Sequence, residues 1–124
     1  VPHYKFAVKS ELFGNEAKAN LAYCYLVLKK TRKAKRLFKE LVDIFQNNYK
    51  IQYNMALCYS RLKKREKALI YLNRAANLES GFGGIYLTRG HIHLIMGNKE
   101  LAKKDLERAK SLGSSQSDKL MKRL

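Results

Sequence analysis

Residues 54–78 read NMALCYSRLKKREKALIYLNRAANL, and this stretch decides the fold. Its first half places apolar side chains three or four positions apart, as at Met55, Tyr59 and Leu62. Its second half continues with the same kind of spacing. Because such spacing puts side chains on one face of a helix, each half predicts an amphipathic helix. The polar run 63–67 predicts a turn, so the stretch forms a helical hairpin that is too small to bury its own apolar face.

The pattern returns 34 residues upstream and 34 residues downstream, with no insertion. Six columns of corresponding residues hold across the three copies. They are Ala22/Ala56/Gly90, Tyr25/Tyr59/His93, Ala34/Ala68/Ala102, Phe38/Leu72/Leu106, Leu41/Ala75/Ala109 and Ile44/Leu78/Leu112. A fixed period of this length indicates a solenoid of stacked hairpins.

Small residues in two columns explain the predicted geometry. Ala22, Ala56 and Gly90 lie midway along each first helix, and the third column lies early in each second helix. Small side chains at a crossing let two helices approach closely. Tyr25 and Tyr59 would fill the wider space beyond the crossing.

These columns resemble the tetratricopeptide repeat (TPR) family, whose signature is small–x–x–aromatic in the first helix and Ala–x–x–x–aromatic or Leu in the second. The resemblance covers residues 15–114 and implies an all-α solenoid of three hairpins with a partial helix at each end. The sequence departs from the family at three columns. The family's Trp position holds Lys18, Gln52 and Tyr86, its closing Pro position holds Gln46, Ser80 and Ser114, and Arg89 stands where Leu21 and Met55 predict an apolar residue.

The period divides the chain into repeats at 15–48, 49–82 and 83–116. Residues 1–14 would be the tail of a preceding repeat or an N-terminal capping helix, closed by Gly14 and Asn15. Residues 117–124 would be a C-terminal capping helix with Ser117 as its N-cap. The expected helices within the repeats are 16–28, 32–45, 51–62, 65–78, 85–96 and 99–112, and 118–124 would follow.

Composition limits the class of protein. The 124 residues suffice for one domain. No run of apolar residues is long enough to span a membrane. No signal peptide is recognisable and the cysteines are expected to be reduced, which favours a cytoplasmic location. Cys24 and Cys58 share a column and are expected to be packed, reduced thiols rather than a bridge.

The resemblance implies that the first helices line a concave groove that binds a peptide or helix of a partner protein. The groove candidates are Ala19, Asn20, Tyr23, Tyr53, Asn54, Leu57, Arg61, Leu87, Thr88 and His91. Asn20 and Asn54 recur at one position, and an amide can hydrogen-bond a peptide backbone whatever its side chains. Arg61 favours an acidic side chain in the ligand.

One TPR subclass clamps the C-terminal carboxylates of chaperones with Lys, Asn and Arg at five groove positions. In this chain those positions hold Ala19, Tyr23, Asn54, Gly84 and Thr88. Only Asn54 matches, so this clamp is not expected here.

The net charge of +16 suggests an alternative function. Basic residues gather in the turn and second helix of the copies, as at Lys30, Lys35, Lys64 and Lys67, and stacking would align them into a ridge. Such a ridge could bind RNA, DNA or another polyanion, although few aromatic residues are interleaved with it. Self-association through the end helices is a third hypothesis.

No catalytic, metal or cofactor site is predicted. His91 and His93 are two positions apart on one helix and point to different faces, whereas a helical metal site needs a spacing of three or four. No nucleophile with a neighbouring base and no phosphate-binding loop is recognisable. We therefore expect a non-enzymatic adaptor.

Overall fold

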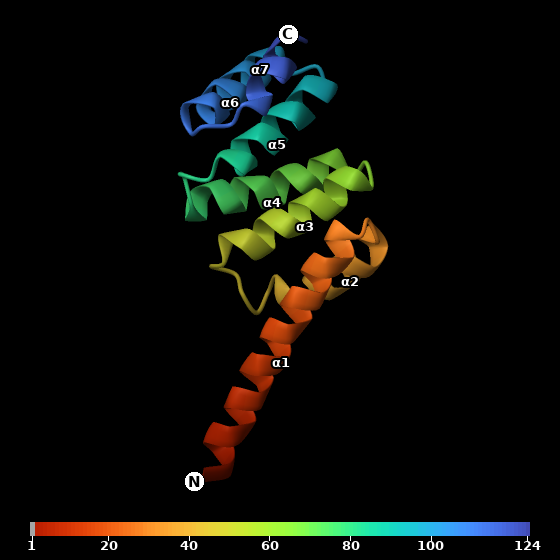
Figure 1. Cartoon of the computed structure of the whole chain (residues 1–124), viewed down its shortest axis with the longest axis vertical. Helices are drawn as coiled ribbons and strands as arrows, with labels where there is room; N and C mark the ends of the chain where they lie inside the picture. Colours follow the sequence, from red (N-terminus) through yellow and green to blue (C-terminus); the bar gives the residue numbers. More distant parts are fainter. Residues whose placement is uncertain (1) are drawn as a thin grey trace.

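The computed structural model describes the backbone of residues 2–124 and the side chains of residues 14–124. This part of the chain is all-α, which confirms the predicted fold class. The helices are α1 (Pro2–Val27), α2 (Thr31–Leu41), α3 (Tyr49–Arg61), α4 (Arg65–Leu78), α5 (Gly83–Ile95), α6 (Lys99–Ser111) and α7 (Gln116–Met121) (Figure 1).

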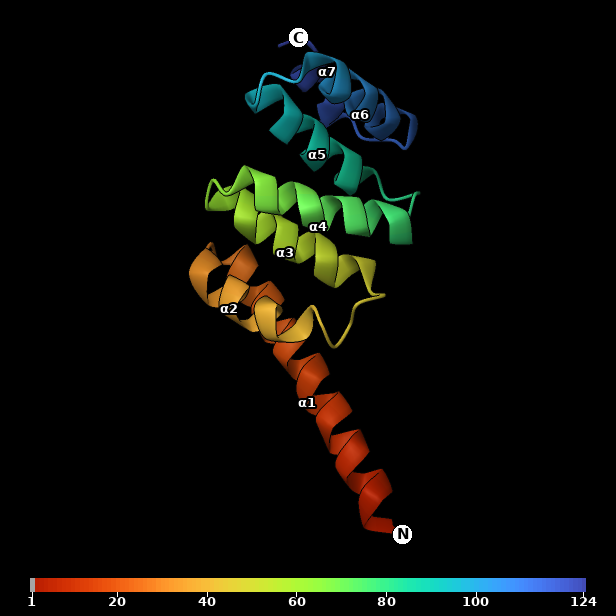
Figure 2. The same cartoon turned by 180° about the vertical axis from the view of Figure 1, so that it is seen from behind.

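The helices form three hairpins, α1/α2, α3/α4 and α5/α6, which stack one upon the next. Helix α7 packs on both helices of the last hairpin. Figures 1 and 2 show the stack from opposite sides, with the first part of α1 projecting beyond it. Each hairpin contacts only its neighbours in sequence, as expected of a solenoid.

Small residues lie at the helix crossings, as the columns predict. Ala22, Ala56 and Ala68 have no exposed surface. At Gly90, an added β carbon would lie only 2.9 Å from side-chain atoms of Leu106 on the facing helix. The close approach of α5 and α6 therefore requires the glycine.

The turns inside the three hairpins share one backbone feature. Lys29 and Lys63 adopt positive φ angles of 63° and 62°, and Gly97 has a φ of 84°. These three residues occupy one column, two positions after the last residue of each first helix. The left-handed conformation strains a lysine but not a glycine. The first two hairpins therefore keep the same turn geometry although they have a lysine where the third has glycine.

Most predicted helix ends lie within two residues of the observed ones, but the start of α1 and the end of α2 differ by more. The predicted turn at Gly14–Asn15 is wrong, because α1 continues without a break through both residues. Glycine weakens a helix by only about 1 kcal/mol, and no atom of the described residues lies within 4 Å of the Gly14 β-carbon position. Helix α2 ends at Leu41 rather than at residue 45, since the Val, Asp, Ile, Phe and Asn residues that follow are weak helix formers.

The C-terminal cap also needs correction. Helix α7 begins at Gln116, so Ser117 lies inside the helix and is not its N-cap. Its side chain is fully buried, and its hydroxyl donates a hydrogen bond of 2.8 Å to the backbone carbonyl of Ser114. This hydrogen bond therefore holds the first turn of α7 against the residue that precedes the helix.

The two cysteines do not have equal surroundings. Both are free, but only Cys58 is buried, whereas Cys24 is exposed. The expectation of two packed thiols is wrong for Cys24. Among the described residues the hairpin of α1 has a neighbouring hairpin on one side only, whereas the hairpin of α3 has one on each side.

Candidate functional site

A pocket of about 650 Å³ lies where the first helices of the first two hairpins meet. Six of the ten predicted groove residues line it: Ala19, Asn20, Tyr23, Tyr53, Asn54 and Leu57. Phe38, Asn48, Tyr49, Lys50, Ile51 and Phe82 complete the lining. Side chains that are more than 30 residues apart in sequence thus form one apolar hollow edged by polar groups.

Two amides distinguish this pocket from an ordinary packing gap. Among the described residues, the side chains of Asn20 and Asn54 make no hydrogen bond to another protein group. Each amide can donate and accept. Tyr23 beside them is 54% exposed, which is high for an aromatic side chain. The pocket therefore offers both hydrogen-bonding capacity and apolar surface to a ligand.

One wall of the pocket is aromatic, and sequence reasoning missed part of it. The ring of Phe82 packs edge-on against Tyr53 at a centroid distance of 5.1 Å and tilts against Tyr49 at 5.7 Å. Phe82 and Asn48 are one period apart, each directly before a first helix. That shared position was the available signal, because residues entering a first helix border the same groove as the helix itself.

The other four candidates lie outside this pocket. The guanidinium of Arg61 donates a hydrogen bond of 2.7 Å to the carbonyl of Leu26 near the C-terminal end of α1. The same carbonyl also accepts a hydrogen bond of 3.1 Å from the backbone N–H of Lys29, so Arg61 is its second donor. Arg61 thus ties α3 to α1.

Thr88, Leu87 and His91 belong to the third hairpin. The hydroxyls of Thr88 and Tyr53 are 3.3 Å apart and share a hydrogen bond, which links the inner walls of two repeats. Leu87 and His91 are half-buried. Desolvation, together with the charges of Arg123 and Arg65, lowers the pKa of His91, so the imidazole is predominantly neutral at physiological pH.

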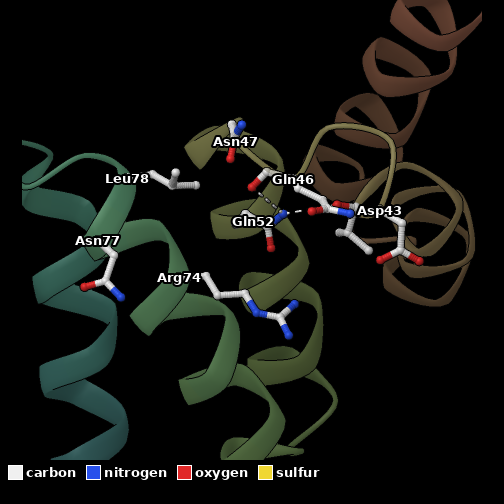
Figure 3. Close-up of a pocket in the computed structure, with 8 residues that line it drawn as sticks. Asp43, Gln46, Asn47, Gln52, Arg74, Asn77 and Leu78 are labelled. Carbon is white, nitrogen blue, oxygen red and sulfur yellow. Dashed lines mark hydrogen bonds between the residues drawn. The ribbon is translucent and has the colours of Figure 1, made fainter.

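A second pocket, of about 480 Å³, opens beside the turn that follows α2 and the C-terminal part of α4. Gln52 lies at its centre and is only 2% exposed. The Gln52 amide nitrogen donates to the carbonyls of Val42 and Gln46, at 3.2 and 3.5 Å. Its amide oxygen is buried and has no partner in the described chain. Figure 3 shows this oxygen turned away from those bonds, on the side of the pocket where Arg74 lies.

Neither metal binding nor a membrane span is indicated in the described part of the chain. No group of three or more His, Cys, Asp or Glu side chains is placed to hold a metal ion there. None of the helices described is both long and apolar enough to cross a membrane.

The stacked hairpins and their small-residue crossings define an α-helical repeat protein. Tetratricopeptide repeat models match residues 16–48, 49–81 and 83–112. The chain belongs to the tetratricopeptide repeat family.

Solved structures show the same fold. The first TPR of Spaghetti (RPAP3), bound to the HSP90 peptide SRMEEVD, is 24% identical, with 88% of each chain covered and a TM-score of 0.82. The Sgt2 TPR domain from Aspergillus fumigatus is 18% identical over 88% of this chain and 75% of its own, with a TM-score of 0.79. The TPR2B domain of yeast Sti1, solved as a pHsp70 complex, is 18% identical over 86% and 95%, with a TM-score of 0.78. No curated protein sequence matches this chain.

Proposed function

We propose that this protein is a non-enzymatic adaptor that binds a peptide segment of a partner protein in the pocket between α1 and α3. The observation that carries the proposal is the meeting of Asn20, Asn54 and Tyr23 around one hollow, with both amides unpartnered in the described chain. The unpaired amides would hydrogen-bond the ligand backbone, and the exposed rings would cover an apolar side chain.

Similar proteins bind peptides with the same architecture. Two of the structures named above hold segments of HSP90 and Hsp70, and the second TPR domain of human RPAP3 holds the HSP70 peptide SGPTIEEVD. These likenesses establish the fold alone, since the identities lie below 25%. They support a protein partner as the class of ligand and leave its sequence open.

The ligand is not predicted to be anchored by its C-terminal carboxylates. Ala19 and Tyr23 line the pocket at positions where the carboxylate-clamp subclass has Lys and Asn. The cation in the pocket lining is Lys50, and it does not occupy one of the clamp positions. We therefore propose an internal segment, held by its backbone and by one apolar side chain, as the ligand.

The test starts from a library of displayed peptides selected on the wild-type protein. Affinities of the selected peptides are then measured by fluorescence anisotropy for wild type and for Asn54→Ala combined with Leu57→Glu. We expect the double variant to bind at least about tenfold more weakly, as for a central interface residue. Undiminished binding by the folded variant would remove the proposal.

Two further variants control for folding and for position. Asn20→Ala with Tyr23→Ala changes exposed groove residues, so it should lose binding without loss of helix content. Ile70→Glu with Asn77→Ala makes the same kinds of change on exposed positions of α4, outside the pocket. This matched variant should bind like wild type.

A further inference from the structure

Cations from two hairpins converge on a pair of stacked tyrosine rings. Tyr59 of α3 and Tyr71 of α4 stack at a centroid distance of 5.6 Å with an interplanar angle of 21°. The ammonium groups of Lys35, from α2, and Lys67, from α4, lie 5.9 and 5.7 Å from the centre of the Tyr59 ring. The guanidinium carbon of Arg74 lies 5.0 Å from the centre of the Tyr71 ring. We call these five residues the cationic strip.

The strip bridges two helices, α2 and α4, whose backbones are not in contact. Helix α3 packs against both α2 and α4, but α2 and α4 make no backbone contact with each other. Lys35 and Lys67 therefore reach one ring from two different hairpins. The sequence expectation that aromatic residues are nearly absent from the basic ridge is wrong here, because Tyr59 and Tyr71 reach it from the core side.

The positive charges of the strip are uncompensated in the described structure. None of its three cations forms an ion pair there. Desolvation and then the charges of Lys64, Lys39, Arg32 and Lys67 lower the pKa of Lys35. Like charges held this close repel one another, so an anion between them would relieve the repulsion.

Each end of the strip opens into a hollow. At one end a space of about 460 Å³ is lined by residues 63–67 and by Met96, whose side chain is 39% exposed. At the other end Arg74 borders the pocket that contains the unpartnered oxygen of Gln52. Glu66 and Asp43 are the acidic residues that line these two hollows.

The groups along the strip select among polyanions. A buried carbonyl oxygen requires a donor, which a peptide N–H supplies and a phosphodiester linkage does not. Exposed Met96 favours an apolar side chain in the ligand. Nucleic-acid bases need accessible rings to stack on, but Tyr59 is only 7% exposed beneath its two lysines. We propose that an acidic polypeptide segment, carrying carboxylates and at least one apolar residue, binds along the cationic strip.

This site is separate from the pocket between α1 and α3, and the two share no lining residue. The proposal therefore does not depend on the proposed function. A protein with both sites would hold two segments of one partner, or two partners, on different faces of the stack.

The test uses a fluorescein-labelled peptide of about ten residues that combines glutamates with two leucines, titrated by anisotropy near 0.15 M salt. The strip variant is Lys35→Gln with Lys67→Gln and Arg74→Gln. The matched control, Lys99→Gln with Lys103→Gln and Lys104→Gln, removes the same charge from exposed positions on α6. We expect the strip variant to bind about tenfold more weakly or worse and the control to change less than about twofold.

Three outcomes overturn the proposal. Equal losses in the two variants would mean that only net charge attracts the peptide. Strip-dependent binding of a single-stranded oligonucleotide of equal charge, tighter than that of the peptide, would assign the strip to nucleic acid. Absence of binding to wild type would remove the site. Retained peptide binding by Asn54→Ala with Leu57→Glu, together with loss in the strip variant, separates this site from the α1–α3 pocket.

Discussion

Arg89 of α5 and Asp105 of α6 are joined by two parallel hydrogen bonds of 2.8 Å each. The side chains are 20% and 9% exposed. Arg89 also donates to the amide oxygen of Asn73 on α4, at 3.1 Å. The hydrogen bonds with Asp105 raise the pKa of Arg89, since they are made to its charged form. The residue that breaks the apolar column of the third repeat is thus paired, and it connects two hairpins.

Removing one partner of this pair should destabilise the third repeat. Arg89→Ala would leave the carboxylate of Asp105 buried beside the His93 imidazole, 4.0 Å away. Desolvation lowers the pKa of His93, so this ring is not a replacement for the lost cation at neutral pH. We expect a loss of about 3 kcal/mol in the free energy of unfolding, because breaking a buried pair leaves an uncompensated charge. Urea denaturation followed by circular dichroism measures it.

The matched control replaces both partners. Arg89→Met with Asp105→Tyr introduces the residues that the second repeat has in these columns, Met55 and Tyr71. Apolar replacement of a whole buried pair is often neutral or stabilising. The double variant should therefore be far more stable than Arg89→Ala, and equal destabilisation of the two variants would contradict this account of the pair.

The crossing of α5 and α6 should not accept a methyl group. In Gly90→Ala the new β carbon would meet Leu106 at 2.9 Å and the β carbon of Asp105 at 3.2 Å. We expect a loss of about 1–3 kcal/mol from overpacking. Gly14→Ala is the control, because Gly14 is helical with open space at this position. It should stabilise the protein by about 0.5–1 kcal/mol, and thermal unfolding resolves the opposite signs.

The HSP90 peptide SRMEEVD should not bind to this protein at micromolar concentration. Ala19, Tyr23, Gly84 and Thr88 replace four of the five polar residues that the carboxylate clamp requires. Calorimetric titration with SRMEEVD and with the same peptide carrying a C-terminal amide tests this expectation. Tight binding that is lost on amidation would show that other cations hold the carboxylate, with Lys50 the first to examine.

The two cysteines should react at very different rates. Burial raises the pKa of Cys58 to about 11 and shields its sulfur, whereas Cys24 is exposed. The thiolate is the reactive form, so iodoacetamide near pH 8 should modify Cys24 and leave Cys58 intact. Peptide mass mapping follows both sites. In urea both should react, and equal rates in the native protein would contradict the burial of Cys58.

Much of the fold could be predicted because its determinants are local and repeat. The bounds of α4 agree with the prediction at both ends, and the buried alanines lie at the crossings that their columns predict. The continuation of α1 through Gly14 was not predictable in the same way. A glycine ends a helix only where the chain changes direction. The sequence pattern does not show whether the chain changes direction at Gly14.

The lining of the candidate pocket was predicted less completely, for a related reason. The residues of first helices, such as Asn20 and Asn54, follow from the repeat register. Phe82 lies in a connection, so its contact with Tyr53 depends on how two hairpins are joined. The partner of Arg89 lies 16 residues away. Asp105 also departs from its column, where the first two repeats have Leu37 and Tyr71. Two charged residues of opposite sign at such positions in one repeat were the signal for the pair.

The pocket between α1 and α3 spans a joint between hairpins that otherwise meet only as neighbours. In such a chain each joint opens at its own rate, so the ends fray before the middle. A peptide bound in this pocket would contact the first two hairpins together and so oppose their separation. Amide protons of α1 and α2 would then exchange more slowly in the complex, while those of α6, two joints away, would keep their original rates.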